Sequence, residues 1–163
     1  MSPVIVDTNV AVVANGAPTH ADDECIVASI EVLSEIRANQ CVLLDRSGLI
    51  LDEYARNLSY AGQPGVGDAF FKWLWENQAN PEHCQQVPIT PVDSPRGFSE
   101  FPEDPTLAAF DWDDRKFVAT AIASGEQPPI INSSDTDWWE YRVALQRNGV
   151  EVRFVCPGLM ETG

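Results

Sequence analysis

The chain has few basic residues. Ten Lys and Arg stand against 25 Asp and Glu, which gives the 163-residue chain a formal net charge of −15. Such an acidic surface repels phosphate backbones at long range, which argues against a high-affinity, non-specific nucleic-acid binder. It does not exclude a nuclease, because a divalent metal and a few well-placed basic side chains supply local compensation. The acidity would also suit a basic protein partner, although most of it is typical of a solvated surface.

Metal-binding cysteine patterns are missing as well. The sequence has four Cys and two His, with no Cys-x-x-Cys pair and no zinc spacing. We therefore expect no zinc site. We expect reduced, mostly buried thiols at Cys25, Cys41, Cys84 and Cys156.

Targeting signals, repeats and phosphate loops are not indicated either. The first residues carry no Lys or Arg, and Asp7 and Asn9 interrupt the apolar stretch 4–13. We therefore expect neither a signal peptide nor a membrane anchor, and a soluble, cytoplasmic protein. No internal repeat or low-complexity tract is present, and the lone Gly-x-Gly turn at 64–67 is too weak to indicate a phosphate loop. With 44% hydrophobic residues, residues 1–163 are expected to form one domain.

The first strand ends in polar residues. Residues 4–6 have the β-branched character of a buried strand, and Asp7, Thr8 and Asn9 follow directly. Open α/β sheets place their sites at the carboxyl ends of strands. Asp and Asn also favour turns, so these residues alone leave a turn and a site equally open. Three further acidic positions downstream favour the site.

Helical and strand patterns alternate along the rest of the chain. We expect helices at 19–39, 49–58 and 68–77, in the stretch 111–123, and in a segment that follows Ser133 and ends near Gly149. We expect further strands at 41–45, 86–90, 129–132 and 151–155. Ser47 is the expected cap of the second helix. Asp45 ends a strand and fits a turn better than a site.

Two stretches keep alternative interpretations. The Pro-rich, irregular segment 91–110 is of a kind that often covers a site, and disorder or a surface excursion is the alternative. The helix at 68–77 carries four aromatic residues. Core packing is their default role, followed by a dimer or partner surface and then base stacking.

Two acids compete in the helix at 49–58. Asp52 lies four residues before Arg56, which is the spacing of an exposed ion pair. Glu53 shares a helix face with Leu49 and Ile50 and so points towards packed structure. We therefore favour Glu53 as the functional acid.

Asp114 begins an apolar helical stripe. Phe117 and Val118 follow it at three and four residues. Because an unpaired carboxylate facing the core is expensive, Asp114 requires a cap role, a cation partner or a site. Asp113 is better explained as an acid that complements the helix dipole.

Asp135 follows the strand at 129–132. Ser134 and Asp137 have the spacing of a capping arrangement, which is the structural explanation. In a parallel sheet, however, this strand end would also place hydroxyls, amides and a carboxylate beside Asp7.

The acids could converge on one cation. Carboxylates ~4 Å apart repel by about 4 kcal/mol at an effective dielectric of 20, so a cluster needs a divalent ion. Oxygen ligands suit Mg²⁺ or Mn²⁺ better than zinc. Such an ion can stabilise charge on a phosphoryl oxygen during an in-line displacement. The candidate acids are Asp7, Glu53, Asp114 and Asp135.

Four acidic motifs, in this order over nearly the whole chain, resemble those of PIN domain nucleases. They are the stretches 4–9, 50–54, 114–121 and 133–138. The resemblance implies an α/β fold with three layers, in which helices flank a central parallel sheet of about five strands. It also implies a metal-dependent endoribonuclease that uses Mg²⁺ or Mn²⁺, similar to VapC-type toxins of toxin–antitoxin pairs. Its partners would be an RNA substrate, a basic antitoxin or other protein, and a second copy in a homodimer.

The family roles transfer position by position. The catalytic, metal-binding acids would be Asp7, Glu53, Asp114 and Asp135, with Asp137 as an auxiliary ligand. Asn9 and Ser133 would orient ligands or water. The hypothetical phosphate contacts, which could instead be ion-pair partners of acids, are Arg46, Arg56, Arg115 and Lys116. The chain departs from the family in its strong acidity, its Pro-rich segment and Ser133 in place of the usual Thr.

Two rivals stay open. A HAD-type phosphatase also has a strand that ends in Asp, but its motif needs a second Asp where Asn9 stands. A non-catalytic PIN-like module that binds protein is the stronger rival. Metal binding through several carboxylates would separate it from a nuclease.

Overall fold

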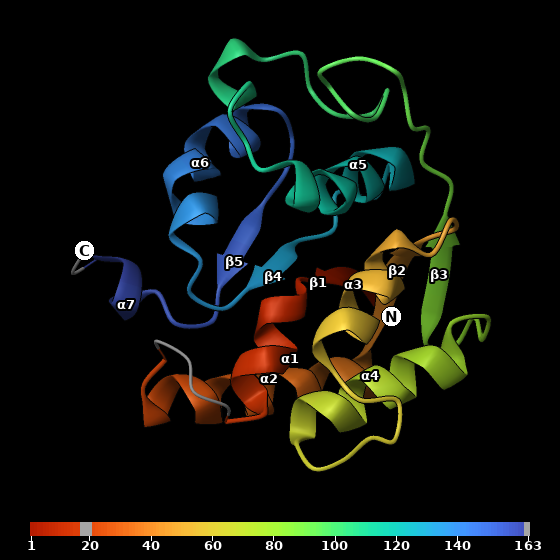
Figure 1. Cartoon of the computed structure of the whole chain (residues 1–163), viewed down its shortest axis with the longest axis vertical. Coiled ribbons are helices and arrows are strands. Elements are labelled where there is room, and N and C mark those ends of the chain that lie inside the picture. Colours follow the sequence, from red (N-terminus) through yellow and green to blue (C-terminus); the bar gives the residue numbers. More distant parts are fainter. Residues whose placement is uncertain (17–20, 162–163) are drawn as a thin grey trace.

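The strand β1 (Ser2–Val6) is the centre of a five-stranded sheet in the computed structural model, which describes residues 1–16 and 21–161. The order is β3-β2-β1-β4-β5, and every neighbouring pair is parallel (Figure 1). The prediction of a parallel sheet of about five strands is confirmed. The other strands are β2 (Gln40–Asp45), β3 (Cys84–Val87), β4 (Ile130–Asn132) and β5 (Val152–Phe154).

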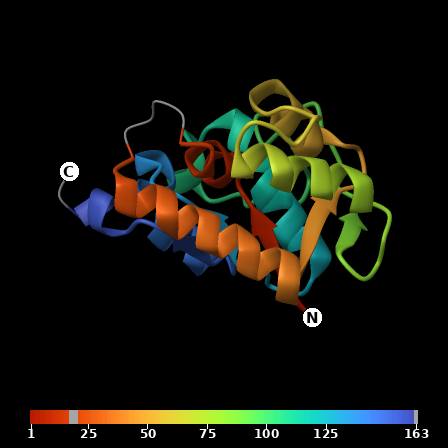
Figure 2. The same cartoon turned by 90° about the horizontal axis from the view of Figure 1, so that it is seen from below.

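Helices cover both faces of this sheet, which makes an α/β fold of three layers. One layer is formed by α1 (Thr8–Ala14), α2 (Asp23–Asn39) and α4 (Val66–Asn77), which pack against one another. The opposite side carries α5 (Arg115–Ser124) and α6 (Thr136–Arg147) (Figures 1 and 2). Between them, α3 (Leu49–Asn57) contacts both α1 and α5. Of the described helices, none is long and apolar enough to cross a membrane.

Several element boundaries differ from the sequence prediction. The helix α1 was not predicted, because its valines at 10, 12 and 13 continue the strand-like composition of β1. The helix α2 begins at Asp23, and its cap is Asp22, which accepts a hydrogen bond from the Cys25 amide. The predicted first residues at 19–20 lie outside the described residues. The strand β3 lies about two residues earlier than expected, and the short α7 (Gly158–Glu161) was not foreseen.

The Pro-rich segment 91–110 is an ordered part of the core rather than a surface excursion. Its Phe101, Leu107 and Phe110 are almost fully buried, although it contains just one short helical turn, η1 (Pro105–Leu107), within the described residues. Arg115 is 2% exposed and binds this segment through its side chain. Its guanidinium donates to the carbonyls of Pro95, Arg96, Leu107, Ala108 and Phe110.

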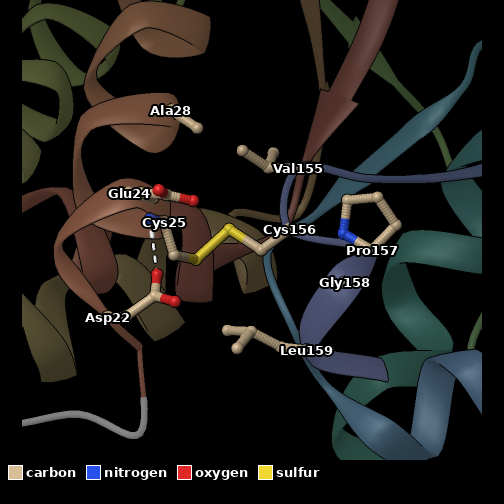
Figure 3. A pocket seen from close by; sticks show the side chains of 9 residues that line it. All are labelled: Asp22, Glu24, Cys25, Ala28, Val155, Cys156, Pro157, Gly158 and Leu159. Atoms are coloured by element: carbon tan, nitrogen blue, oxygen red, sulfur yellow. Dashed lines mark hydrogen bonds between the residues drawn. A yellow bond between two sulfur atoms is a disulfide. The ribbon is translucent and has the colours of Figure 1, made fainter. Parts of the chain in front are cut away.

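The cysteines correct the expectation of four reduced thiols. Cys25 and Cys156 form a disulfide, with their Cα atoms 5.5 Å apart, whereas Cys41 and Cys84 are free. The bond joins the first turn of α2 to the segment after β5 and lies beside a cavity of about 530 Å³ (Figure 3). Sequence could not reveal this pair, because 131 residues separate its members.

Candidate active site

Asp7 stands at the carboxyl end of the central strand and begins α1. Its Oδ1 accepts a hydrogen bond of 3.0 Å from the Asn9 amide, so the residue is the helix cap as well as a site candidate. Its Oδ2 accepts a hydrogen bond of 3.4 Å from the side-chain nitrogen Nδ2 of Asn132. Only 4% of Asp7 is exposed. The pKa of Asp7 is raised to about 7, mainly by burial and also by the charges of Glu53 and Asp135, against the lowering effect of the Asn9 hydrogen bond.

Glu53 reaches this region from α3, as the helix-face argument predicted. Its Oε2 accepts a hydrogen bond from the Thr8 hydroxyl, and its Oε1 accepts one of 2.8 Å from the Lys116 ammonium. The side chains of Lys116 and Glu53 are only 8% and 15% exposed. Both carboxylate oxygens of Glu53 therefore have partners from within the chain.

The start of α3 corrects one prediction. Asp45, not Ser47, satisfies its first amides: Oδ2 accepts from Leu49 and Oδ1 from Ile50, each at 2.8 Å. A third hydrogen bond, of 2.6 Å from the Tyr54 hydroxyl to the Val6 carbonyl, joins α3 to β1. These bonds fix the helix that carries Glu53 against the strand that carries Asp7.

Asp114 lies at the junction of η2 (Trp112–Asp114) and α5. Its side chain makes no capping hydrogen bond, so the interpretation as an ordinary cap is not supported. The cap of η2 is Asp111, which accepts from the Asp113 amide. Burial raises the pKa of Asp114 to about 8, reinforced first by the charge of Asp7 and also by those of Asp111, Asp135 and Glu53.

Asp135 follows β4 and caps α6. Its Oδ1 accepts from the Asp137 amide at 2.9 Å, so Asp135 rather than Ser134 is the cap, and Asp137 itself is exposed. Burial also raises the pKa of the half-buried Asp135. Its amide donates to Oδ1 of Asn132, the same side chain that contacts Asp7.

Two strand ends are tied together by side-chain amides. Asn132 is fully buried at the end of β4, and the Ser133 amide donates to Asn9 Oδ1 at 3.1 Å. Asn9 thus acts on the backbone of Ser133, and the Ser133 hydroxyl lies 3.6 Å from the Cys25 sulfur. Asn132 was not among the site residues predicted from the sequence. Its place as the last residue of a strand beside Asp7 was the available signal.

The predicted basic contacts fall into two groups. Arg115 spends its donors on backbone carbonyls and is not placed to contact a substrate, which corrects that assignment. Lys116 is 6% exposed and pairs with Glu53. By contrast, Arg46 and Arg56 are exposed.

The donor set has the chemistry of an Mg²⁺ or Mn²⁺ site, since it consists of carboxylates with amide and hydroxyl neighbours. The charges of Glu53, Asp135 and Asp114 act on one another or on Asp7 across the site. Within residues 1–16 and 21–161, however, no three His, Cys, Asp or Glu side chains are grouped closely enough to hold an ion. Both carboxylate oxygens of Glu53 already accept hydrogen bonds in this arrangement, from Thr8 and from Lys116.

Comparisons of the chain with known protein families, curated proteins and solved structures find no match.

Proposed function

We propose that the protein is a metal-dependent endoribonuclease that hydrolyses phosphodiester bonds, with the site built from Asp7, Glu53, Asp114 and Asp135. The observation that carries the proposal is the gathering of these acids beside the central strand, where Asn132 contacts both Asp7 and Asp135 and where Thr8, next to Asp7, contacts Glu53. The charges of Asp7 and the other acids also act on Asp114. Retaining buried like charges costs stability, which favours a functional reason for them.

The chain's own residues have distinct tasks in this proposal. Asp7, Glu53, Asp114 and Asp135 would hold Mg²⁺ or Mn²⁺, and Asp137, on the exposed first turn of α6, would be an outer auxiliary. Asn132 and Asn9 position the strand ends through their hydrogen bonds to Asp7 and to the Ser133 amide. When bound, the metal would stabilise negative charge that develops on a phosphoryl oxygen.

The biological setting follows from the same proposal. An acidic protein with a net charge of −15 would suit a basic antitoxin segment, as in a toxin–antitoxin pair, and a cytoplasmic location would give access to RNA. A homodimer is a further proposal. The aromatic pair of Tyr60 and Trp75, in which Trp75 belongs to α4, offers a surface for one, because the two residues are 51% and 45% exposed.

One observation favours a second function. The ion pair between Lys116 and Glu53 neutralises one of the four carboxylates without any metal. A non-catalytic PIN-like module that binds protein could retain the acids in this form.

Cleavage of an RNA pool that contains single-stranded and structured regions separates these functions. We expect cleavage with Mn²⁺ or Mg²⁺, and a loss of at least 100-fold in Asp7→Asn and Asp114→Asn, because each amide removes a charge from the site but keeps its shape. Asp52→Asn, on the exposed side of α3, is the matched control and should cleave normally. No cleavage by wild type would exclude the nuclease and favour the binding module. Cleavage that persists without metal would exclude the metal-dependent mechanism.

A further inference from the structure

Lys116 places a positive charge inside the acidic site. It lies in the first turn of α5, two residues after Asp114, and is 6% exposed. Its ammonium donates to Glu53 Oε1 at 2.8 Å and to the Asp113 carbonyl. A nearly buried lysine is expensive unless it is paired, and this one has a carboxylate and a carbonyl as partners.

With Lys116 in place, each carboxylate oxygen of Glu53 accepts a hydrogen bond. Thr8 occupies Oε2 through its hydroxyl, and Lys116 occupies Oε1. A hydroxyl is neutral and can remain beside a metal-bound carboxylate. An ammonium repels a divalent cation, by several kcal/mol at a separation of ~4 Å and an effective dielectric of 20. The two partners therefore differ: Thr8 is compatible with a metal on Glu53, whereas Lys116 is not.

The electrostatic role of Lys116 extends beyond Glu53. Its charge also acts favourably on the ionised form of Asp7, which is the central acid of the site. Lys116 thus performs part of the neutralisation that a divalent cation would perform. This is a different role from the phosphate contact that the sequence suggested, because the ammonium is nearly excluded from solvent.

We propose that Lys116 is an internal counter-cation that competes with the divalent metal for Glu53, so that the metal binds only when the ammonium leaves Oε1. The inference rests on the proposed function in that it assumes a metal site at these acids. It predicts that the wild-type protein binds metal weakly and that its lysine, rather than a missing ligand, sets this limit.

Calorimetric titration with Mn²⁺ tests the competition. We expect Lys116→Met, which keeps the length of the side chain but removes its charge, to bind Mn²⁺ at least tenfold more tightly than wild type. Lys116→Arg keeps the charge and should bind as weakly as wild type. Lys72→Met is the matched control, since Lys72 is exposed and pairs with Glu76 on the surface. Equal or weaker binding by a folded Lys116→Met would overturn the proposal.

Thermal unfolding gives a second signature. Without metal, Lys116→Met should have a lower Tm than wild type, because Glu53 and Asp7 lose their cation. Saturating Mn²⁺ should raise the Tm of the variant more than that of wild type. An equal metal-induced rise in the two proteins would contradict competition.

A wild-type measurement covers the case in which the variant does not fold. Acetylation of Lys116 by a limiting amount of acetic anhydride, measured by mass spectrometry, should increase when Mn²⁺ is added, because the ammonium leaves its buried partners. Unchanged or reduced acetylation would overturn the proposal. RNA cleavage is a separate measurement. If Lys116→Met binds Mn²⁺ more tightly but wild type does not cleave RNA, the nuclease is refuted and the role of Lys116 stands. If wild type cleaves RNA but Lys116→Met binds Mn²⁺ no more tightly, the role of Lys116 is refuted and the nuclease stands.

Discussion

At the scale of single residues, ionisation of two carboxyls in the site is unfavourable. Asp7 and Asp114 have pKa values of about 7 and about 8, far above their ordinary value of 3.8, because both are buried among other acids. Well below pH 3.8, both carboxyls are protonated in the folded and unfolded chains alike. As the pH rises, the unfolded chain releases these protons first, so the folded state binds more protons and loses stability until each folded pKa is passed.

This imbalance predicts a measurable pH dependence for Asp7. Between about pH 4 and pH 7, Asp7 should lower the free energy of unfolding by on the order of 4 kcal/mol in metal-free protein. Asp7→Asn removes the titration but keeps a good helix cap. In urea unfolding with EDTA, wild type should therefore lose more stability than the variant between pH 5 and pH 8. Parallel losses in the two proteins would show that Asp7 is ionised in the fold at low pH.

At the scale of elements, the position of Glu53 depends on how α3 begins. Asp45 satisfies two amides of its first turn, and Gly48, with φ of 87°, lets the chain turn between strand and helix. A cap of this kind contributes about 1 kcal/mol. Its position at the end of β2 also orients the helix relative to the sheet.

Loss of this cap should affect stability and metal binding together. We expect Asp45→Ala to lower the free energy of unfolding by about 1–2 kcal/mol and to weaken Mn²⁺ binding, because α3 would no longer hold Glu53 in register. Chemical denaturation and calorimetry measure the two effects. Asp52→Ala on the same helix is exposed and should change neither. Weakened stability with unchanged Mn²⁺ affinity would mean that α3 does not need this cap to position Glu53.

Sequence predicted the elements better than it predicted their contacts. Periodicity identified the face of Glu53 and the apolar stripe behind Asp114, since both depend on neighbours within one helix. The helix α1 escaped because its β-branched residues imitate a strand. Lys116 and Asn132 could not be assigned to Glu53 and Asp7, because these pairs are 63 and 125 residues apart and form only after folding.

At the scale of the whole molecule, the disulfide is the feature that departs most from the sequence prediction. Thiol titration in denaturant without reductant should find two free thiols, from Cys41 and Cys84, and four after reduction. Cys25→Ser should raise the unreduced count from two to three, because it frees Cys156. Four thiols in the unreduced wild type would restore the original expectation of reduced cysteines. The wild-type bond should also stabilise the fold by about 2–4 kcal/mol relative to the reduced protein.

The disulfide closes a covalent ring of residues 25–156, which an arm precedes and a short tail follows. The ring contains β2 and β4, yet the strand between them, β1, belongs to the arm. Glu53, Asp114 and Asp135 are therefore on the ring, and Asp7 is inserted into it from outside. If a protease cut the backbone between residues 7 and 25, three acids would remain on the closed ring. Asp7 would then be attached to the rest of the protein by non-covalent contacts alone.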